Sequence, residues 1–222
     1  LFFMVVRFVT FESENPQEYL TQIKIGSATK RWQSAYELSK ILSDPDKVPL
    51  DNQFKNSIIN IFEQSVHDDP KVRMYLALAM GRTGDDAYGA SLMTALNDQN
   101  AEIITAAIQA LGLIQYTPAV AELSVMATSS EFQSIRLASA IALGQIGDVS
   151  SLPLLKNLLD DEEANIRWDA AIALAKMGNR SGANIINSLL NRSYYKNFKE
   201  IDSWETEKAI LVAIHVSSQL GG

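Results

Sequence analysis

The sequence predicts an all-α fold, specifically an α-solenoid of about six short helical hairpins. One segment is repeated four times, and its successive copies are 31, 32 and 31 residues apart. Within each copy, with Arg73 and its equivalents as position zero, apolar or small residues recur at −1, +3, +4 and +7, the spacing of one helical face. A fixed period of this length is typical of stacked units that contact only their neighbours. The four copies are residues 72–81, 103–112, 135–144 and 166–175.

Each copy also carries its own stop and its own packing surface. A glycine at +11 is suited to the left-handed conformation that ends a helix, and Gln115 is the exception among Gly84, Gly147 and Gly178. Alanine at +3 and +4 and a small residue at +8 lack bulk, so we expect a neighbouring helix to approach closely there. The small residues at +8 are Gly81, Gly112, Gly144 and Ala175.

The elements before the first full copy follow from capping residues. Asn15 and Pro16 begin a helix that runs to about Ile25, and residues 30–38 are a degenerate copy with Arg31, Ala35 and Leu38 in register. Pro45 and Pro49 then lie in a loop before Asp51 caps a helix over residues 54–65.

A partner helix precedes each later copy, and a polar residue opens it. The expected pairs of cap and helix are Asp85 or Asp86 with 88–96, Thr117 with 119–126, Ser150 or Ser151 with 152–159, and Ser181 with 183–190. A last helix over residues 204–220 completes about six hairpins, after an insertion at residues 191–203 that the other units lack.

Composition argues against several classes of function. The formal charge of −7 and the pI near 4.9 disfavour nucleic acid as a partner. Cysteine is absent, the two histidines are far apart in sequence, and no phosphate loop, nucleophile motif or metal-ligand spacing is present. We therefore expect no enzyme activity, no catalytic residues, no cofactor and no metal.

The first 14 residues are predicted to be separate from the repeat domain at 15–222. The chain begins with six apolar residues followed by Arg7, and either they end a transmembrane anchor or they form an apolar arm over the first repeat. With an anchor, the positive charges nearby favour a cytoplasmic position for the repeat domain; otherwise we expect a cytoplasmic protein. The six residues are Leu1, Phe2, Phe3, Met4, Val5 and Val6.

The pattern Asp-x-x-x-x-Ile-Arg-x-x-Ala-Ala-x-Ala-Leu, best preserved at residues 161–174, resembles the HEAT repeat. The short period is similar to the HEAT-like repeats of phycobilisome-lyase-type proteins, which are widespread in bacteria. The resemblance implies a right-handed α-solenoid of about six HEAT-like hairpins whose second helices line the concave face. It also implies a structural ladder between repeats, formed by Arg73, Arg136 and Arg167 with Asp98 and Asp161.

Candidate binding residues lie at positions that the core pattern leaves outward. Positions +1 and +5 carry apolar and aromatic side chains where a solvent-facing helix needs polar ones, which indicates a partner surface. Packing between repeats is the alternative, and it is the stronger one for Leu137, Ile141 and Ile172. The predicted surface consists of Trp32, Tyr36, Met74, Tyr75, Arg82, Trp168 and Lys176.

The insertion offers a second candidate patch, formed by Tyr194, Tyr195 and Phe198. Long loops of repeat proteins tend to lie on functional faces, but these aromatic residues could instead fold back and seal the last hairpin.

We therefore expect a non-catalytic scaffold that binds other protein subunits through its concave face. With an N-terminal anchor it would be a membrane-associated accessory subunit or assembly factor. The alternatives are a phycobilisome-lyase-like chromophore accessory protein and a soluble peptide-binding regulator.

Overall fold

The computed structural model describes residues 15–198 and 201–220, and these residues form α-helices and short 3-10 turns without any strand. The all-α prediction is confirmed. The expected anchor or arm at Leu1–Val6 lies outside the described residues. Contacts divide the chain into two compact units, residues 1–110 and 111–222, and each unit is described by itself.

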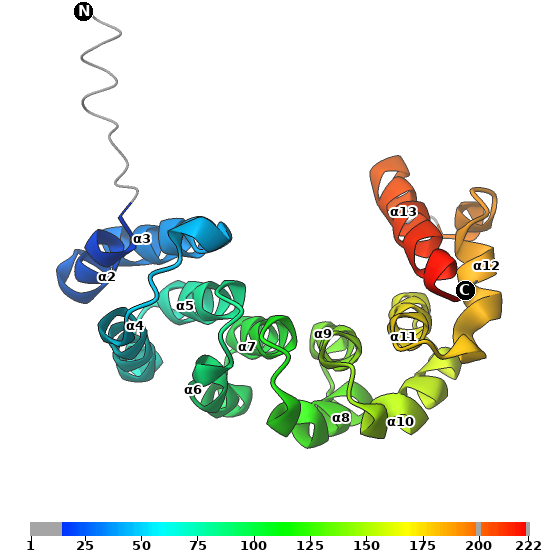
Figure 1. Cartoon of the computed structure of the whole chain (residues 1–222), viewed down its shortest axis with the longest axis horizontal. Coiled ribbons are helices and arrows are strands. Elements are labelled where there is room, and N and C mark those ends of the chain that lie inside the picture. Colours follow the sequence, from blue (N-terminus) through cyan, green and yellow to red (C-terminus); the bar gives the residue numbers. More distant parts are fainter. Residues whose placement is uncertain (1–14, 199–200, 221–222) are drawn as a thin grey trace, which may run out of the picture. The chain divides into compact units, whose positions relative to one another are not determined.

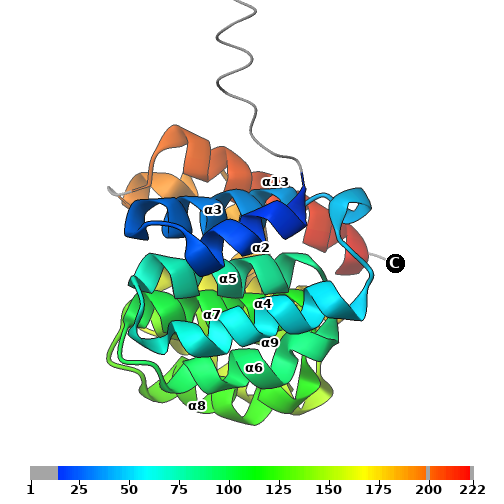
Figure 2. The same ribbon diagram turned by 90° about the vertical axis from the view of Figure 1, so that its left-hand side faces the viewer.

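The first unit contains three consecutive helix pairs. They are α2 (Pro16–Ile25) with α3 (Ala28–Ile41), α4 (Asn52–Gln64) with α5 (Pro70–Arg82), and α6 (Gly89–Thr94) with α7 (Ala101–Leu113), which ends just past the unit boundary. Figure 1 shows α4 and α6 in one layer and α5 and α7 in the other. Helix α3 packs against both α2 and α5, and Figure 2 shows the helices of this unit running alongside one another.

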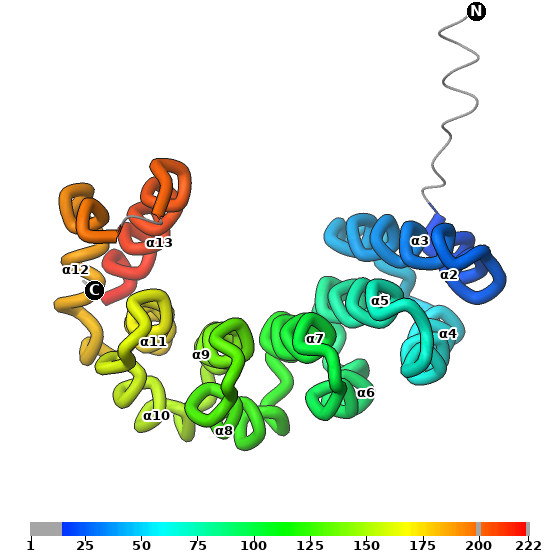
Figure 3. The backbone as a smooth tube through the Cα atoms, turned by 180° about the vertical axis from the view of Figure 1, so that it is seen from behind, coloured from blue at the N-terminus to red at the C-terminus, as the bar shows by residue number. Residues whose placement is uncertain are grey.

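The second unit repeats this arrangement. Its pairs are α8 (Val120–Ser129) with α9 (Gln133–Ile146), α10 (Leu152–Asn157) with α11 (Ala164–Lys176), and α12 (Ala183–Leu189) with α13 (Ser203–Leu220). Helix α9 packs against α8 and α11, and α11 packs in turn against α12 and α13 (Figure 3). The described residues thus form six helix pairs, the number that the repeat predicted.

The repeat positions −1, +3, +4 and +7 are the core, as the sequence predicted. Every residue at these positions in the four copies is buried. Ser139 is the one polar member, and its hydroxyl is buried without a hydrogen-bond partner. The other members are Val72, Leu76, Ala77, Met80, Ile103, Ala107, Ile108, Leu111, Ile135, Ala140, Leu143, Ile166, Ala170, Ala171 and Leu174.

The small residues at +8 allow the close approach that was predicted. A Cβ atom on Gly144 would lie 2.4 Å from the Cβ and 2.9 Å from the Cα of Ala173 in the next repeat copy. Gly81 and Gly112 meet Ala110 and Ala142 in the same way. In each case the glycine faces the +6 alanine of the following copy, so adjacent second helices touch almost backbone to backbone.

All four copies end in the left-handed conformation. Gly84 and Gly147 have φ of 71° and Gly178 has φ of 72°, which glycine adopts without steric cost. Gln115, the one residue at this position that is not glycine, has φ of 52° and adopts the same left-handed conformation. At this position the fold imposes the conformation on a residue that does not favour it.

The capping residues require a correction. Asp85 accepts a hydrogen bond from the backbone N–H of Ala87, as predicted. Ser151 is the N-cap residue of α10, as predicted, but its side chain makes no capping hydrogen bond. Asp148 and Asn179 instead cap the 3-10 turns that precede α10 and α12, and Ser150, Ser181 and Thr117 lie within such turns. The reason is that a 3-10 turn precedes each of these short helices. The residue that caps the turn therefore comes immediately after the residue with positive φ in the sequence.

The expected ladder of ion pairs is present only in part. Arg31 pairs with Asp68, and Arg73 pairs with Asp98 at 3.1 Å while also donating to the carbonyl of Phe62. Arg136 and Arg167 donate to main-chain carbonyls within their own hairpins instead of to an aspartate of the next unit. The prediction that they and Asp161 continue the ladder is therefore wrong.

Candidate interaction face

The outward positions of the second helices are the accessible part of the repeat. At +5, Tyr36 is 40% exposed and Ile141 is 37% exposed, although both are large and largely apolar. At +1, Trp32, Met74 and Leu137 are half-buried. These side chains contrast with the fully buried core positions on the same helices, so each unit has a candidate interaction face at these positions.

In the first unit this face is aromatic and edged with cations. The rings of Tyr36 on α3 and Tyr75 on α5 meet edge to face with centroids 5.2 Å apart. The Nζ of Lys40 lies 5.2 Å from the ring centroid of Tyr36, and the Nζ of Lys71 lies 5.0 Å from that of Trp32. Cations and aromatic rings at these distances attract one another.

The other predicted residues of this unit lie on α5. Met74 is half-buried next to Tyr75. The guanidinium of Arg82 donates to the carbonyl of Ser39 at 2.6 Å and to its hydroxyl at 3.0 Å. Arg82 therefore links α5 to α3, and part of its donor capacity is used within the protein.

In the second unit, the expectation that Trp168 is exposed is wrong. Its exposed fraction is 8%, and it packs in the core of the last two helix pairs. The indole N–H donates to the hydroxyl of Tyr194 at 3.3 Å, and the ring centroid lies 4.9 Å from that of Phe198. Tyr194, Tyr195 and Phe198 of the inserted segment thus pack their rings against Trp168.

Tyr195 has the same structural role. It is 5% exposed and its hydroxyl donates to the carbonyl of Leu189 at 2.8 Å. This is the alternative in which the aromatic residues of the insertion seal the last pair. Tyr194 and Phe198 are half-buried, and a second binding patch there stays a prediction.

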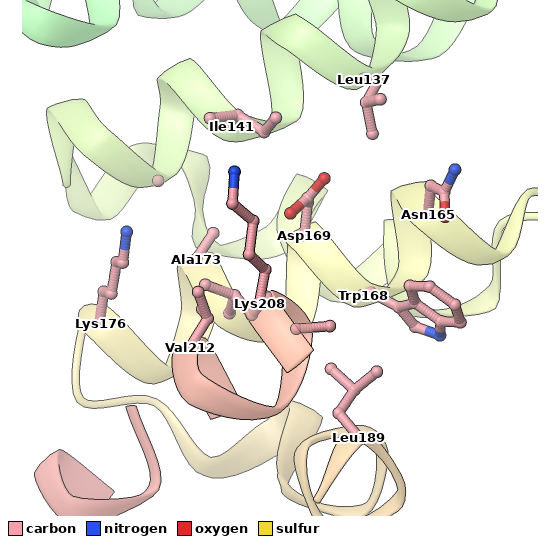
Figure 4. Close-up of a pocket in the computed structure, with 13 residues that line it drawn as sticks. Leu137, Ile141, Asn165, Trp168, Asp169, Ala173, Lys176, Leu189, Lys208 and Val212 are labelled. Carbon is pink, nitrogen blue, oxygen red and sulfur yellow. The ribbon is translucent and has the colours of Figure 1, made fainter. Parts of the chain in front are cut away.

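A pocket of about 350 Å³ opens between α9, α11 and α13 (Figure 4). Leu137, Ile141 and Ile172 line it. Ile141 is accessible, whereas Ile172 is half-buried and packs against the core of the last two helix pairs, so packing between repeats stays a prediction for Leu137 and Ile172. Of the predicted binding residues, Trp168 and Lys176 reach it. Its other lining residues are Gly144, Asn165, Asp169, Ala173, Leu189, Lys208, Ala209 and Val212.

Asp169 is the pocket residue that the sequence did not single out. Its carboxylate is partly buried and makes no hydrogen bond or ion pair with the residues that the structure describes. Burial raises the pKa of Asp169 to about 6, and Lys176 opposes part of that rise. The available signal was an acidic residue at +2, where the preceding copies carry Tyr75, Ala106 and Ala138.

In residues 15–198 and 201–220, no three histidine, cysteine or carboxylate side chains are grouped closely enough to hold a metal ion. Within the same ranges, no helix combines the length and the apolar character that crossing a bilayer requires.

Comparison with known proteins identifies the repeat. The sequence profile of a family described as HEAT repeats matches residues 57–128 and 120–200, which together span more than half of the chain. No curated protein matches the sequence.

Similar solved structures are also repeat proteins. The complex of CpcE and CpcF of phycocyanin lyase from Nostoc sp. contains a chain with a TM-score of 0.64 and 16% identity, with 96% of each chain covered. An engineered protein has a TM-score of 0.57 and 16% identity, covering 92% of this chain and 97% of its own. A designed armadillo repeat protein in complex with the peptide (KR)4 has a TM-score of 0.54 and 15% identity, covering 92% and 99%. At these identities the likeness shows the fold alone.

Proposed function

The chain belongs to the HEAT-repeat family, and from this premise we propose that it is a non-catalytic scaffold that binds another protein through its second helices. This is the concave face of the expected solenoid. The family builds binding surfaces from repeated helices, whereas a catalytic set needs convergent reactive groups. No such set is found among the described residues.

One observation carries this proposal. The second helices leave large apolar and aromatic side chains accessible at +5 in Tyr36 and Ile141, and half-buried at +1 in Trp32, Met74 and Leu137. In the first unit these side chains include Tyr36, which forms an aromatic pair with Tyr75, and in the second unit they include Ile141, which lines the pocket. Accessible aromatic and aliphatic anchors near cations are typical of protein interfaces.

The test compares two double variants in a quantitative affinity capture from cells that express the protein. Tyr36→Ala with Tyr75→Ala removes the aromatic pair, and Lys55→Ala with Gln53→Ala on α4 is the matched control on the other layer. We expect the first variant to lose its specific protein partners while its helicity and melting temperature stay close to wild type. Equal capture by wild type and both variants would contradict the proposal.

A finer proposal concerns where in the cell the protein acts. A membrane-associated accessory subunit or assembly factor is supported by the apolar run at residues 1–6 followed by Arg7. Fractionation of the full-length protein tests this, because co-sedimentation with membranes that survives high salt requires an apolar attachment. Recovery in the soluble fraction would refute it.

A chromophore accessory protein is the second candidate. It is favoured by the likeness to the phycocyanin lyase chain, which at 16% identity extends to the fold and not to an activity. A visible absorption band in the purified protein would support this candidate over the scaffold.

A further inference from the structure

We propose that the pocket between α9, α11 and α13 receives an apolar side chain from an acidic segment of the partner protein. The proposal rests on the proposed scaffold function and adds the chemistry of what is bound. It follows from three features of the pocket: apolar walls, two lysines that form no ion pair with the described residues, and one carboxylate that forms no hydrogen bond with them.

The walls of the pocket suit an aliphatic or aromatic side chain. Leu137 and Ile141 from α9, Ile172 from α11 and Val212 from α13 enclose most of it, and Leu189 forms the part next to α12. A volume of about 350 Å³ is at the lower end of the range for small ligand sites, which is enough for one or two large side chains.

The charges around the opening favour an anionic segment. Lys176 and Lys208 are both exposed, and neither forms an ion pair with a residue in the described part of the chain. The Nζ of Lys208 lies 3.5 Å from the ring centroid of Trp204, an interaction that leaves its N–H donors available. Figure 4 shows both lysines and Asp169 pointing toward α9, where Ile141 lies.

The net charge at the pocket is therefore positive in a protein whose overall charge is −7. Two lysines and one aspartate line it, and α9 and α12 add no charged residue to its lining. A local charge opposite in sign to that of the whole chain favours carboxylates flanking the apolar side chain and disfavours a basic segment.

Asp169 makes the expected binding depend on pH. When ionised, it repels the acidic segment, and when protonated it does not. Lys176 and Lys208 are the other charged groups that line the pocket. Acidic segments should therefore bind more tightly at pH 5.5 than at pH 7.5.

The experiment uses three labelled hexapeptides with blocked ends and the full chain, with binding measured by fluorescence anisotropy at low salt. Each peptide carries two central leucines, flanked by four glutamates, four serines or four lysines. We expect the glutamate peptide to bind most tightly. Lys176→Glu with Lys208→Glu should weaken it by about tenfold or more, whereas Lys156→Glu with Lys196→Glu, a control of equal charge, should change it less than about twofold.

Two further variants test the pocket itself. Ile172→Ala should weaken all three peptides alike, because it removes apolar wall without changing charge. Asp169→Asn should strengthen the glutamate peptide at pH 7.5 and have little effect at pH 5.5, where Asp169 is largely protonated in wild type. This loss of pH dependence would not follow from a change of stability.

Several outcomes overturn the inference. They are tighter binding of the lysine peptide, an equal effect of the two lysine pairs, and no binding of the glutamate peptide at millimolar concentration. If the lysine peptide binds and Ile172→Ala weakens it, the face still binds a protein segment, and the proposed function survives while the acidic chemistry fails. Failure of the scaffold function itself is measured separately, by the capture experiment with Tyr36 and Tyr75.

Discussion

Replacing Gly144 with alanine should destabilise the second unit, although alanine is the better helix former. The new Cβ would lie 2.4 Å from the Cβ of Ala173, where ordinary contacts begin at about 3.4 Å, so α9 and α11 must separate locally by about 1 Å. Overpacking of this kind costs about 1 to 3 kcal/mol, and because the main chain is also too close we take the upper end. Helix propensity returns about 1 kcal/mol, which leaves a net loss of about 2 kcal/mol.

The assay is urea unfolding followed by circular dichroism, with a melting curve as a second measurement. For a chain of this length the loss corresponds to a decrease in melting temperature of roughly 4 to 8 °C. Ala173→Gly as a background removes the nearest atom, so the cost of Gly144→Ala should shrink there. The reasoning is refuted if Gly144→Ala is neutral or stabilising, or if its cost is the same in both backgrounds.

Three further predictions concern single residues. Trp168→Ala should lower the free energy of unfolding in urea by about 3 to 5 kcal/mol, because it leaves a cavity in the core. Tyr36→Ala, at an exposed position, should lower it by less than about 1 kcal/mol. Similar values for the two variants would contradict the burial of Trp168. Gln115→Gly should stabilise the folded protein by about 0.5 to 1 kcal/mol, since glycine adopts a φ of 52° without steric cost. A lower melting temperature of this variant would show that the lost hydrogen bond from Gln115 to the carbonyl of Gln145 contributes more. The pKa of Asp169 is raised from 3.8 to about 6 by folding, so the native state holds this proton more tightly and stability should fall by roughly 1 to 3 kcal/mol between pH 4 and pH 6. Unfolding measured across this range should show the decrease in wild type and not in Asp169→Asn; equal slopes would refute it.

The helices and the core were predictable because the same pattern of apolar residues recurs in four copies. Four copies in register separate the columns that must be apolar from those that vary, and every residue predicted at a core position in these copies is buried. The tight contact at Gly144 was also predictable, because a small residue recurs at the same place in each copy. Capping residues were less predictable, since Asp148 and Asn179 act one turn earlier than the pattern of a single α-helix suggests.

The candidate interaction face was predictable as a set of outward repeat positions but not residue by residue. Trp32, Tyr36 and Tyr75 lie where the register placed them, on neighbouring helices of one unit. Trp168 occupies an equivalent repeat position but is buried, because Tyr194, Tyr195 and Phe198, which belong to an insertion without counterpart in the other copies, pack against it. A repeat pattern carries no information about the contacts of a segment that occurs once.

By itself, the sequence determined the all-α fold, the number of hairpins, the core columns and the close contacts between second helices. These depend on the period of apolar and small residues, a local property that each copy repeats. The tertiary structure alone decided that Trp168 belongs to the core, that Ile141 is accessible, and that Asp169, Lys176 and Lys208 share one pocket. Those outcomes depend on which side chains meet across helices far apart in the chain, and on the single insertion that closes one end of the second unit.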